Sequence, residues 1–193
     1  MLIIVSGFAG SGKSSLADSL GKTLKLEVIH ASALLKEMCV SGNKKLEHAS
    51  VKKVKDWWES DEAKKIMINR KNDSSYDLAL DEKLKKIAKK GNVILDSWTM
   101  PYLYKGKAFR VWLSASAEVR AKRVSKRDNL KYEKVLDKIK ARDSQTKSLY
   151  ETLYNFSMGD NLEVFDLEID TDNVSQEEVF EKVLSKIKGV SFE

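Results

Sequence analysis

Eight residues near the start of the chain have the types and spacing of a phosphate-binding loop. Residues 7–14 read Gly-Phe-Ala-Gly-Ser-Gly-Lys-Ser, which matches the pattern GxxxxGKS. Glycines let a backbone turn tightly and point its N–H groups into a phosphate-sized nest. In this pattern Lys13 would reach the β- and γ-phosphates, and the Ser14 hydroxyl would ligate Mg²⁺. The sequence therefore predicts binding of a nucleoside triphosphate; the alternative is an unrelated glycine-rich turn.

A carboxylate and several hydroxyl groups are expected at the same edge of the fold as this loop. Ligands of open α/β sheets bind at the carboxyl ends of the strands. The segments 30–32 (His-Ala-Ser), 96–98 (Asp-Ser-Trp) and 114–116 (Ser-Ala-Ser) each follow an apolar run. Among them Asp96 could hold Mg²⁺ through water, contact a substrate, or only cap the next turn. We expect Asp96 to serve the site because the phosphate loop should lie beside it.

A basic stretch from Arg120 to Arg142 contains ten Lys or Arg residues and three Asp or Glu residues. Arg123 and Arg127 lie four residues apart, on one face of a predicted helix. Arg127 falls at a break between two helical patterns, where a mobile segment could carry it over the phosphates. Arginines there would neutralise the charge of a transferring phosphoryl group. The alternative is a solvated basic face.

Apolar runs and helical patterns alternate along the chain and must position these residues. The expected strands are Leu2–Val5, Leu26–His30, Asn92–Asp96, Ala108–Leu113 and Glu163–Ile169. The expected helices are Lys13–Leu24, Ala31–Val40, several between 46 and 90, Ala117–Lys126, Glu133–Phe156, and one that begins after a capping box of Ser175 and Glu178. This alternation predicts an α/β fold, a three-layer sandwich with a five-stranded parallel sheet covered on both faces.

Composition restricts the classes of protein that the chain could belong to. It has 193 residues, 42% of them apolar, and no apolar run long enough to span a membrane. No secretory signal pattern is present, and the one cysteine, Cys39, excludes an internal disulfide, so we expect a cytoplasmic protein. With two histidines and one cysteine, a structural zinc site is not expected. The net charge of +6 fits either nucleic acid or small anionic substrates.

Five further segments carry a resemblance to a known family. They are residues 30–38 (HASALLKEM), 89–98 (KKGNVILDSW), 112–128 (WLSASAEVRAKRVSKRD), 139–143 (IKARD) and 166–171 (DLEIDT). Together with the phosphate loop, they resemble archaeal-type cytidylate kinases, which are nucleoside monophosphate kinases. The spacing of the arginines in 112–128 is the more specific signal, since many families share the phosphate loop.

The resemblance implies a fold, a reaction and a set of site residues. The fold would be that of P-loop kinases, as one domain over 1–193 whose core is 1–45, 76–126 and 132–193. Residues of about 46–75 would form a helical acceptor-binding insertion, and about 127–131 a lid. The reaction would be phosphoryl transfer from ATP, with Mg²⁺, to a nucleoside monophosphate, CMP or dCMP first. The implied donor contacts are Gly7, Phe8, Ala9, Gly10, Ser11, Gly12, Lys13, Ser14 and Ser15. The implied catalytic residues are Lys13, Arg123, Arg127 and Arg142; the acceptor contacts are Ser32, Asp96 and Trp98; and the Mg²⁺ ligands are Ser14 and Asp96.

Two positions depart from the family pattern. Trp98 stands where the family usually has an arginine that can grip the acceptor phosphate, and residues 96–101 are similar to a turn of adenylate kinases instead. After Arg142 a second arginine is replaced by Lys147, which cannot bind a phosphate in the bidentate way of arginine.

The sequence leaves several alternatives open. They are a kinase for AMP, UMP or a non-nucleotide metabolite, and a nucleotide-dependent RNA-binding protein. A GTPase is disfavoured because the chain contains no N-K-x-D motif. We expect a monomer or weak dimer whose partner is the nucleoside monophosphate, with neither a membrane nor nucleic acid as a partner.

Overall fold

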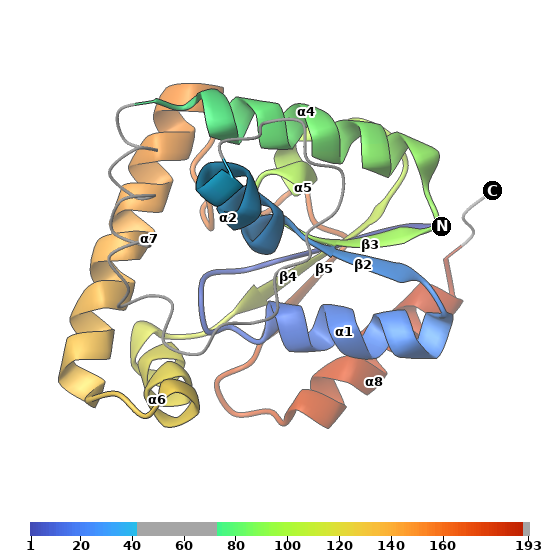
Figure 1. The fold of residues 1–193 in the computed structure, drawn as a ribbon. Helices are drawn as coiled ribbons and strands as arrows, with labels where there is room; N and C mark the ends of the chain where they lie inside the picture. Colours follow the sequence, from blue (N-terminus) through green and yellow to red (C-terminus); the bar gives the residue numbers. More distant parts are fainter. Residues whose placement is uncertain (42–72, 191–193) are drawn as a thin grey trace.

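A computed structural model describes residues 1–41 and 73–190, and these residues form a succession of helices and strands (Figure 1). The strands are β1 (Leu2–Ser6), β2 (Glu27–His30), β3 (Val93–Asp96), β4 (Phe109–Ser114) and β5 (Leu167–Asp170). The helices are α1 (Lys13–Leu24), α2 (Ala31–Ser41), α4 (Ser75–Lys90), α5 (Met100–Leu103), α6 (Ala117–Asp128), α7 (Tyr132–Tyr154) and α8 (Gln176–Lys188). The predicted insertion, about 46–75, lies almost entirely outside the described residues, so its helices stay a prediction.

The five strands form one parallel sheet in the order β2-β3-β1-β4-β5. β1 is central, pairing Leu2 with Val93 of β3 and Ile3 with Phe109 of β4. The chain order of neighbouring strands changes direction at β1, and ligands bind at such a switch point. The phosphate loop follows β1, so the fold places it where a ligand is expected.

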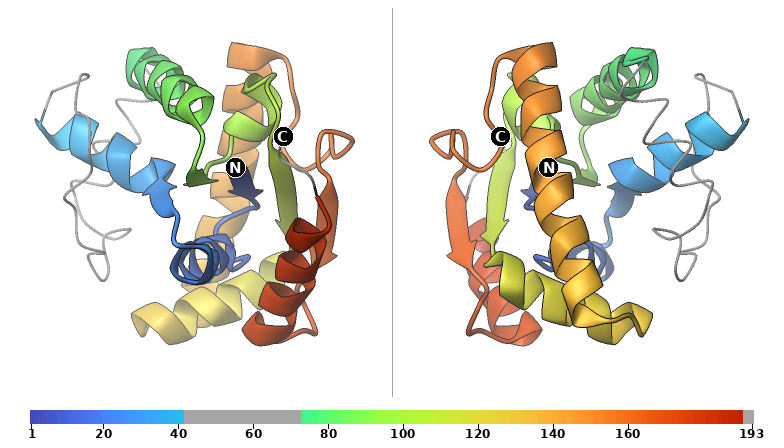
Figure 2. Two further views of the ribbon diagram at one scale, coloured as in Figure 1. Left: turned by 90° about the vertical axis from the view of Figure 1, so that its right-hand side faces the viewer. Right: turned by 90° about the vertical axis from the view of Figure 1, so that its left-hand side faces the viewer.

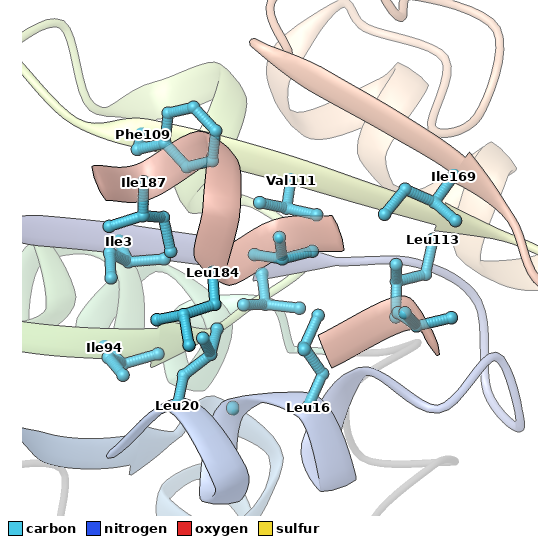
Figure 3. Close-up of a cluster of buried hydrophobic side chains, with 14 residues drawn as sticks. Ile3, Leu16, Leu20, Ile94, Phe109, Val111, Leu113, Ile169, Leu184 and Ile187 are labelled. Carbon is cyan, nitrogen blue, oxygen red and sulfur yellow. The ribbon is translucent and has the colours of Figure 1, made fainter. Parts of the chain in front are cut away.

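Alternate side chains of β1 point to two different cores. Ile3 and Val5 contact the core beneath α1 and α8, which Figure 3 shows with Leu16, Leu20 and Leu184. Leu2 and Ile4 contact the second core, beneath α2 and α4. Burial on both faces explains why β1 reads as a continuous apolar run. Figure 2 shows the two helical layers on opposite faces of the sheet, which confirms the predicted α/β sandwich.

Helices α6 and α7 lie beside the carboxyl ends of the strands, outside the two main layers (Figure 1). They pack against each other through Ala121, Val135 and Ile139. The far end of α7 covers a cluster of aromatic side chains around Tyr102, Trp112 and Phe156. None of the described helices is both long and apolar enough to cross a bilayer.

The observed elements differ from the sequence-based expectation by one added helix and by several shifted ends. Helix α5 was not expected, because the turn after Asp96 continues into one short helical turn with a proline at its start. Helix α6 continues to Asp128, two residues further than predicted, and ends where Asn129 adopts a left-handed conformation with φ of 55°. Strand β5 begins at Leu167 and not at Glu163, since residues before it form turns.

Candidate active site

The phosphate loop connects β1 to α1 in a conformation that its glycines permit. Gly7 has φ of 148°, and a Cβ atom there would lie 2.4 Å from the carbonyl oxygen of Leu113. The backbone therefore passes closer to β4 than a side chain would allow. Helix α1 begins at Lys13 and has no acidic residue of its own in the first turn, so the N–H groups and the dipole of its N-terminus can favour an anion at the loop.

The loop also contains an unsatisfied buried donor. Ser11 is 1% exposed, and its hydroxyl has no hydrogen-bond partner within the part of the chain that the structure describes. A buried hydroxyl without a partner costs free energy, and an oxygen of a phosphate group would accept a hydrogen bond from it. The loop thus fits a phosphate group by its backbone path and by this hydroxyl.

Asp96, at the end of β3, lies among three polar side chains of the loop and its surroundings. The Ser14 hydroxyl donates to Asp96 Oδ2 at 2.6 Å, and Lys13 Nζ lies 3.9 Å from Asp96 Oδ1. His30 Nδ1 lies 2.8 Å from Asp96 Oδ2. Burial opposes ionisation of this carboxyl, but the Lys13 ammonium and the hydrogen bonds from His30 and Ser14 outweigh it, so the pKa of Asp96 is lowered.

The same surroundings shift the pKa values of Lys13 and His30 in opposite directions. Burial lowers the pKa of Lys13; Asp96 counteracts this, and the charges of Arg142 and Arg127 reinforce it. The pKa of His30 is raised, chiefly by its hydrogen bond to Asp96. Its other nitrogen, Nε2, lies 2.9 Å from Asp18 Oδ1, so the imidazole joins two carboxylates. The sequence places the segment 30–32 at this edge of the sheet, but it does not predict the bridge, because Asp18 comes from a different element, helix α1.

Oxygen atoms at the mouth of the loop fit Mg²⁺. The Ser14 hydroxyl and the Asp96 carboxylate are hard oxygen ligands, the kind that Mg²⁺ prefers, and they already lie within hydrogen-bond distance of each other. This supports the prediction that Ser14 and Asp96 hold the ion.

Trp98 occupies the position between the phosphate loop and α7. Its indole N–H donates to the carbonyl oxygen of Gly7 at 2.8 Å. The Arg142 guanidinium lies 4.9 Å from the centroid of its ring, and Lys13 Nζ lies 5.8 Å from the same centroid. The structure thus brings together three residues that the sequence analysis had assigned to different parts of the site.

Arg120, which sequence reasoning did not single out, holds the other side of the loop. It is 4% exposed and donates to the Ala9 carbonyl at 3.3 Å and to Asp143 Oδ2 at 2.6 Å. Its guanidinium also lies 5.4 Å from the Phe8 ring centroid. The only sequence signal was its membership in the arginine-rich stretch. Arg120 therefore ties the loop to α7 and is a buried structural arginine.

Arg123 faces a cleft beside the loop and contacts the end of β5. Its Nη1 donates to Thr171 Oγ1 at 2.9 Å, and its Nη2 donates to the Thr171 carbonyl. The cleft has a volume of about 280 Å³, and we call it the Arg123 cleft. Its lining includes Ser11, Ser15, Arg123, Thr171, Val174 and Gln176. The family resemblance implies a catalytic role for Arg123, but nothing in the sequence predicts Thr171 as its partner, because the two residues are 48 positions apart.

Arg127 has a different partner. It binds the Asp128 carboxylate through both Nε and Nη2, each at 2.6 Å, and its side chain is 59% exposed.

Two further residues named in the sequence analysis lie outside these contacts. Ser32 is exposed in the first turn of α2. Lys147 binds Asp160 at 2.9 Å and lies 5.9 Å from the Phe8 ring centroid.

The parallel sheet, with a phosphate loop after its central strand, has the fold of P-loop kinases. The solved structures that match include the shikimate kinase of Bacteroides thetaiotaomicron, with a TM-score of 0.59 at 12% identity, covering 98% of this chain and 97% of that chain. The shikimate kinase of Acinetobacter baumannii, in complex with shikimate, matches with a TM-score of 0.57 at 17% identity, covering 100% and 95%. At these identities the likeness concerns the fold alone.

Comparison of sequences gives the family. The model of the cytidylate kinase-like family matches residues 2–173. A cytidylate kinase of Sulfurisphaera tokodaii is 31% identical over 93% of this chain and 91% of its own, and one of Methanocaldococcus jannaschii is 29% identical over 98% and 99%. The chain belongs to the cytidylate kinase-like family, which confirms the predicted enzyme class of nucleoside monophosphate kinases.

Proposed function

We propose that this protein transfers the γ-phosphoryl group of ATP to CMP or dCMP, yielding ADP and CDP or dCDP. The observation that carries the proposal is the meeting of Lys13, Asp96 and Arg142 around Trp98 at the mouth of the phosphate loop. Phosphoryl transfer needs positioned cations and a metal-binding carboxylate, and it needs no protein nucleophile. Family membership supports CMP as the first acceptor to test.

The donor nucleotide would extend from the phosphate loop into the Arg123 cleft. The N–H groups of residues 7–15 would hold its phosphates, with Lys13 reaching the β- and γ-phosphates. Because Thr171 holds the Arg123 guanidinium in place, its planar face can form one wall for the base of ATP. This assigns Arg123 to donor binding in addition to the catalytic role that the family resemblance implies. Mg²⁺, held by Ser14 and Asp96, would neutralise phosphate charge.

The acceptor would bind on the other side of Asp96, toward Ser32 and Trp98. Arg142 would approach the transferred group from α7. Arg127 would complete the charge neutralisation, and for this it must exchange the Asp128 carboxylate for phosphate oxygens. Residues 127–131 would thereby act as a lid that also excludes water, which would otherwise compete as acceptor.

A coupled assay of ADP release with a panel of CMP, dCMP, UMP, AMP and shikimate tests this proposal. We expect the highest kcat/KM with CMP or dCMP, and no ADP release above background with Lys13→Ala. A preference for AMP, UMP or shikimate would overturn the acceptor assignment. Absence of ADP release with every acceptor would overturn the kinase assignment.

A further inference from the structure

We propose that Trp98 is a positioning residue of the reaction: its indole ring holds the Arg142 guanidinium and the Lys13 ammonium in place before substrates bind. The inference rests on the proposed function, because it concerns the two cations that face the transferring phosphoryl group. It assigns a role to a residue that the sequence analysis could only place among the acceptor contacts.

The ring itself is fixed from two sides. The indole N–H donates to the Gly7 carbonyl at 2.8 Å, which ties Trp98 to the first residue of the phosphate loop. Tyr150 of α7 meets it edge-to-face, with ring centroids 6.4 Å apart. A tryptophan with its N–H bonded and its ring packed has little rotational freedom. Trp98 thus bridges the loop that binds the donor and the helix that carries Arg142.

Both cations lie within the range of a cation–π interaction. The centroid of the Trp98 ring lies 4.9 Å from Arg142 Cζ and 5.8 Å from Lys13 Nζ, and such attraction acts within about 6 Å. Tryptophan is the strongest partner for a cation among the aromatic side chains. Its ring therefore offers negative charge density to both groups at once.

Attraction to the ring matters because the two cations repel each other. The charge of Arg142 contributes to the lowered pKa of Lys13, which shows that they interact across the mouth of the loop. Asp96 counteracts this repulsion on the Lys13 side, where its Oδ1 lies 3.9 Å from Nζ. Arg142 belongs to a different helix, and its guanidinium lies against the same ring that Lys13 faces. When a phosphoryl group enters, it meets two cations already positioned.

A double-mutant cycle tests this role. Trp98→Leu should lower kcat by about tenfold or more, because misplacing a catalytic group by about 1 Å can cost about 100-fold. The KM for ATP should change less than about threefold, since the backbone of the loop holds the donor. Trp98→Phe keeps a ring and should recover most of kcat. In the Arg142→Ala background, Trp98→Leu should cause at most a small further loss.

Two outcomes would overturn the inference. In the first, kcat of the double variant falls by the product of the two factors measured for Trp98→Leu and Arg142→Ala alone, which would show that the two residues act independently. In the second, Trp98→Leu leaves kcat unchanged and raises the KM for the acceptor, which would make Trp98 an acceptor contact. Phe180→Leu is the matched control, because it removes a half-buried ring on α8 and should leave kcat within about twofold. If Trp98→Leu does not fold, Trp98→Met takes its place in the cycle.

Fluorescence separates this inference from the proposed function. The emission of wild type minus that of Trp98→Phe reports on Trp98. Titration with ADP should change this difference, because phosphate oxygens beside the two cations alter the charge that the ring faces. The readout does not depend on which acceptor is phosphorylated, or on turnover at all. An unchanged difference on saturation with ADP would contradict the role of the ring, whereas failure to phosphorylate any acceptor would contradict only the proposed function.

Discussion

The Ser14 hydroxyl donates a hydrogen bond of 2.6 Å to Asp96 Oδ2, which joins the first turn of α1 to the end of β3. This contact connects the loop that would hold the donor to the strand that would present the metal-binding carboxylate. It exists because β1 and β3 are paired in parallel, so that residues after one strand lie beside the end of the other.

Asp96→Asn should impair the use of Mg²⁺. The amide keeps the shape of the side chain but loses the negative charge that a divalent ion requires. We expect kcat to fall by about 100-fold or more, and the Mg²⁺ concentration for half-maximal rate to rise. A Mg²⁺ titration of the ATP- and CMP-dependent rate measures both. If the rate and the titration midpoint matched wild type, Asp96 would not serve the metal.

Lys13→Ala should lower kcat by at least about 100-fold, because it removes a cation placed at the β- and γ-phosphates. The fold should persist, since the lysine contacts Asp96 and the Trp98 ring but belongs to neither hydrophobic core. The control is Lys22→Ala, an exposed basic residue in the last turn of the same helix, which should retain full activity. Steady-state rates of the two variants are compared. Equal rates would refute the assignment of residues 7–14 as the loop that binds the donor phosphates.

Arg127→Ala should reduce kcat more than it weakens ATP binding. In the structure the arginine is held by Asp128, so its interaction with phosphates would form only when the lid closes. Lys126→Ala removes a neighbouring exposed charge from the same helical turn and serves as the control. Measurement of kcat and of the Kd for ATP separates the two effects. An unchanged kcat would remove Arg127 from the lid.

The buried carboxyl of Asp81 should make stability depend on pH. Burial, reinforced by repulsion from Asp77, raises its pKa to about 6, although the hydrogen bonds that Thr99 and Tyr154 donate to it act in the opposite direction. In the unfolded chain Asp titrates near its ordinary value, about 3.9. Between these two values the folded state binds more protons than the unfolded state, so the free energy of unfolding from this group falls as pH rises.

Asp81→Asn should remove this dependence. Relative to wild type, the variant should gain about 2 kcal/mol of stability between pH 4 and pH 7. Urea unfolding at both pH values measures the difference. Glu82→Gln, one residue further on α4, is the control. A hydrogen bond from Lys85 lowers the pKa of Glu82, so the contribution of Glu82 to stability changes with pH in the opposite direction to that of Asp81. A constant difference between wild type and Asp81→Asn would show that Asp81 does not titrate in this range.

Gly159→Ala should destabilise the protein by about 1–2 kcal/mol and disturb the loop. Gly159 has φ of 87°, and a Cβ atom there would lie 2.8 Å from Phe8 Cε2. The segment between α7 and β5 therefore packs directly on the phosphate loop. Gly189→Ala is the control, because its Cβ would make only an ordinary contact, 3.5 Å from the Lys186 carbonyl. Thermal unfolding measures the midpoint temperature of both variants. Equal midpoints for Gly159→Ala and Gly189→Ala would contradict the close contact between Gly159 and Phe8.

Features encoded in short stretches of sequence were predicted well. The phosphate loop, the apolar strand before it, the helix after it, and the capping box of Ser175 and Glu178 depend on neighbouring residues, and the structure contains each of them. The class of fold followed from the alternation of strands and helices. These signals are local, so a single sequence suffices to find them.

Features made by distant residues were not predictable in the same way. Nothing near Trp98 in the sequence indicates that Arg142 lies over its ring, and nothing near Arg123 indicates Thr171 as its partner. The aromatic cluster around Tyr102 and Phe156 likewise forms only when α7 folds back over the sheet. Such contacts depend on tertiary packing, which overrides the local pattern that defines each element.

Direct detection of both products tests the central claim, which is phosphoryl transfer to a cytidine monophosphate. The protein is incubated with ATP, Mg²⁺ and CMP, and the nucleotides are separated by ion-exchange chromatography. The proposed function predicts CDP and ADP in equal amounts, both absent with Lys13→Ala. Formation of ADP without CDP would reveal hydrolysis of ATP and would contradict the claim.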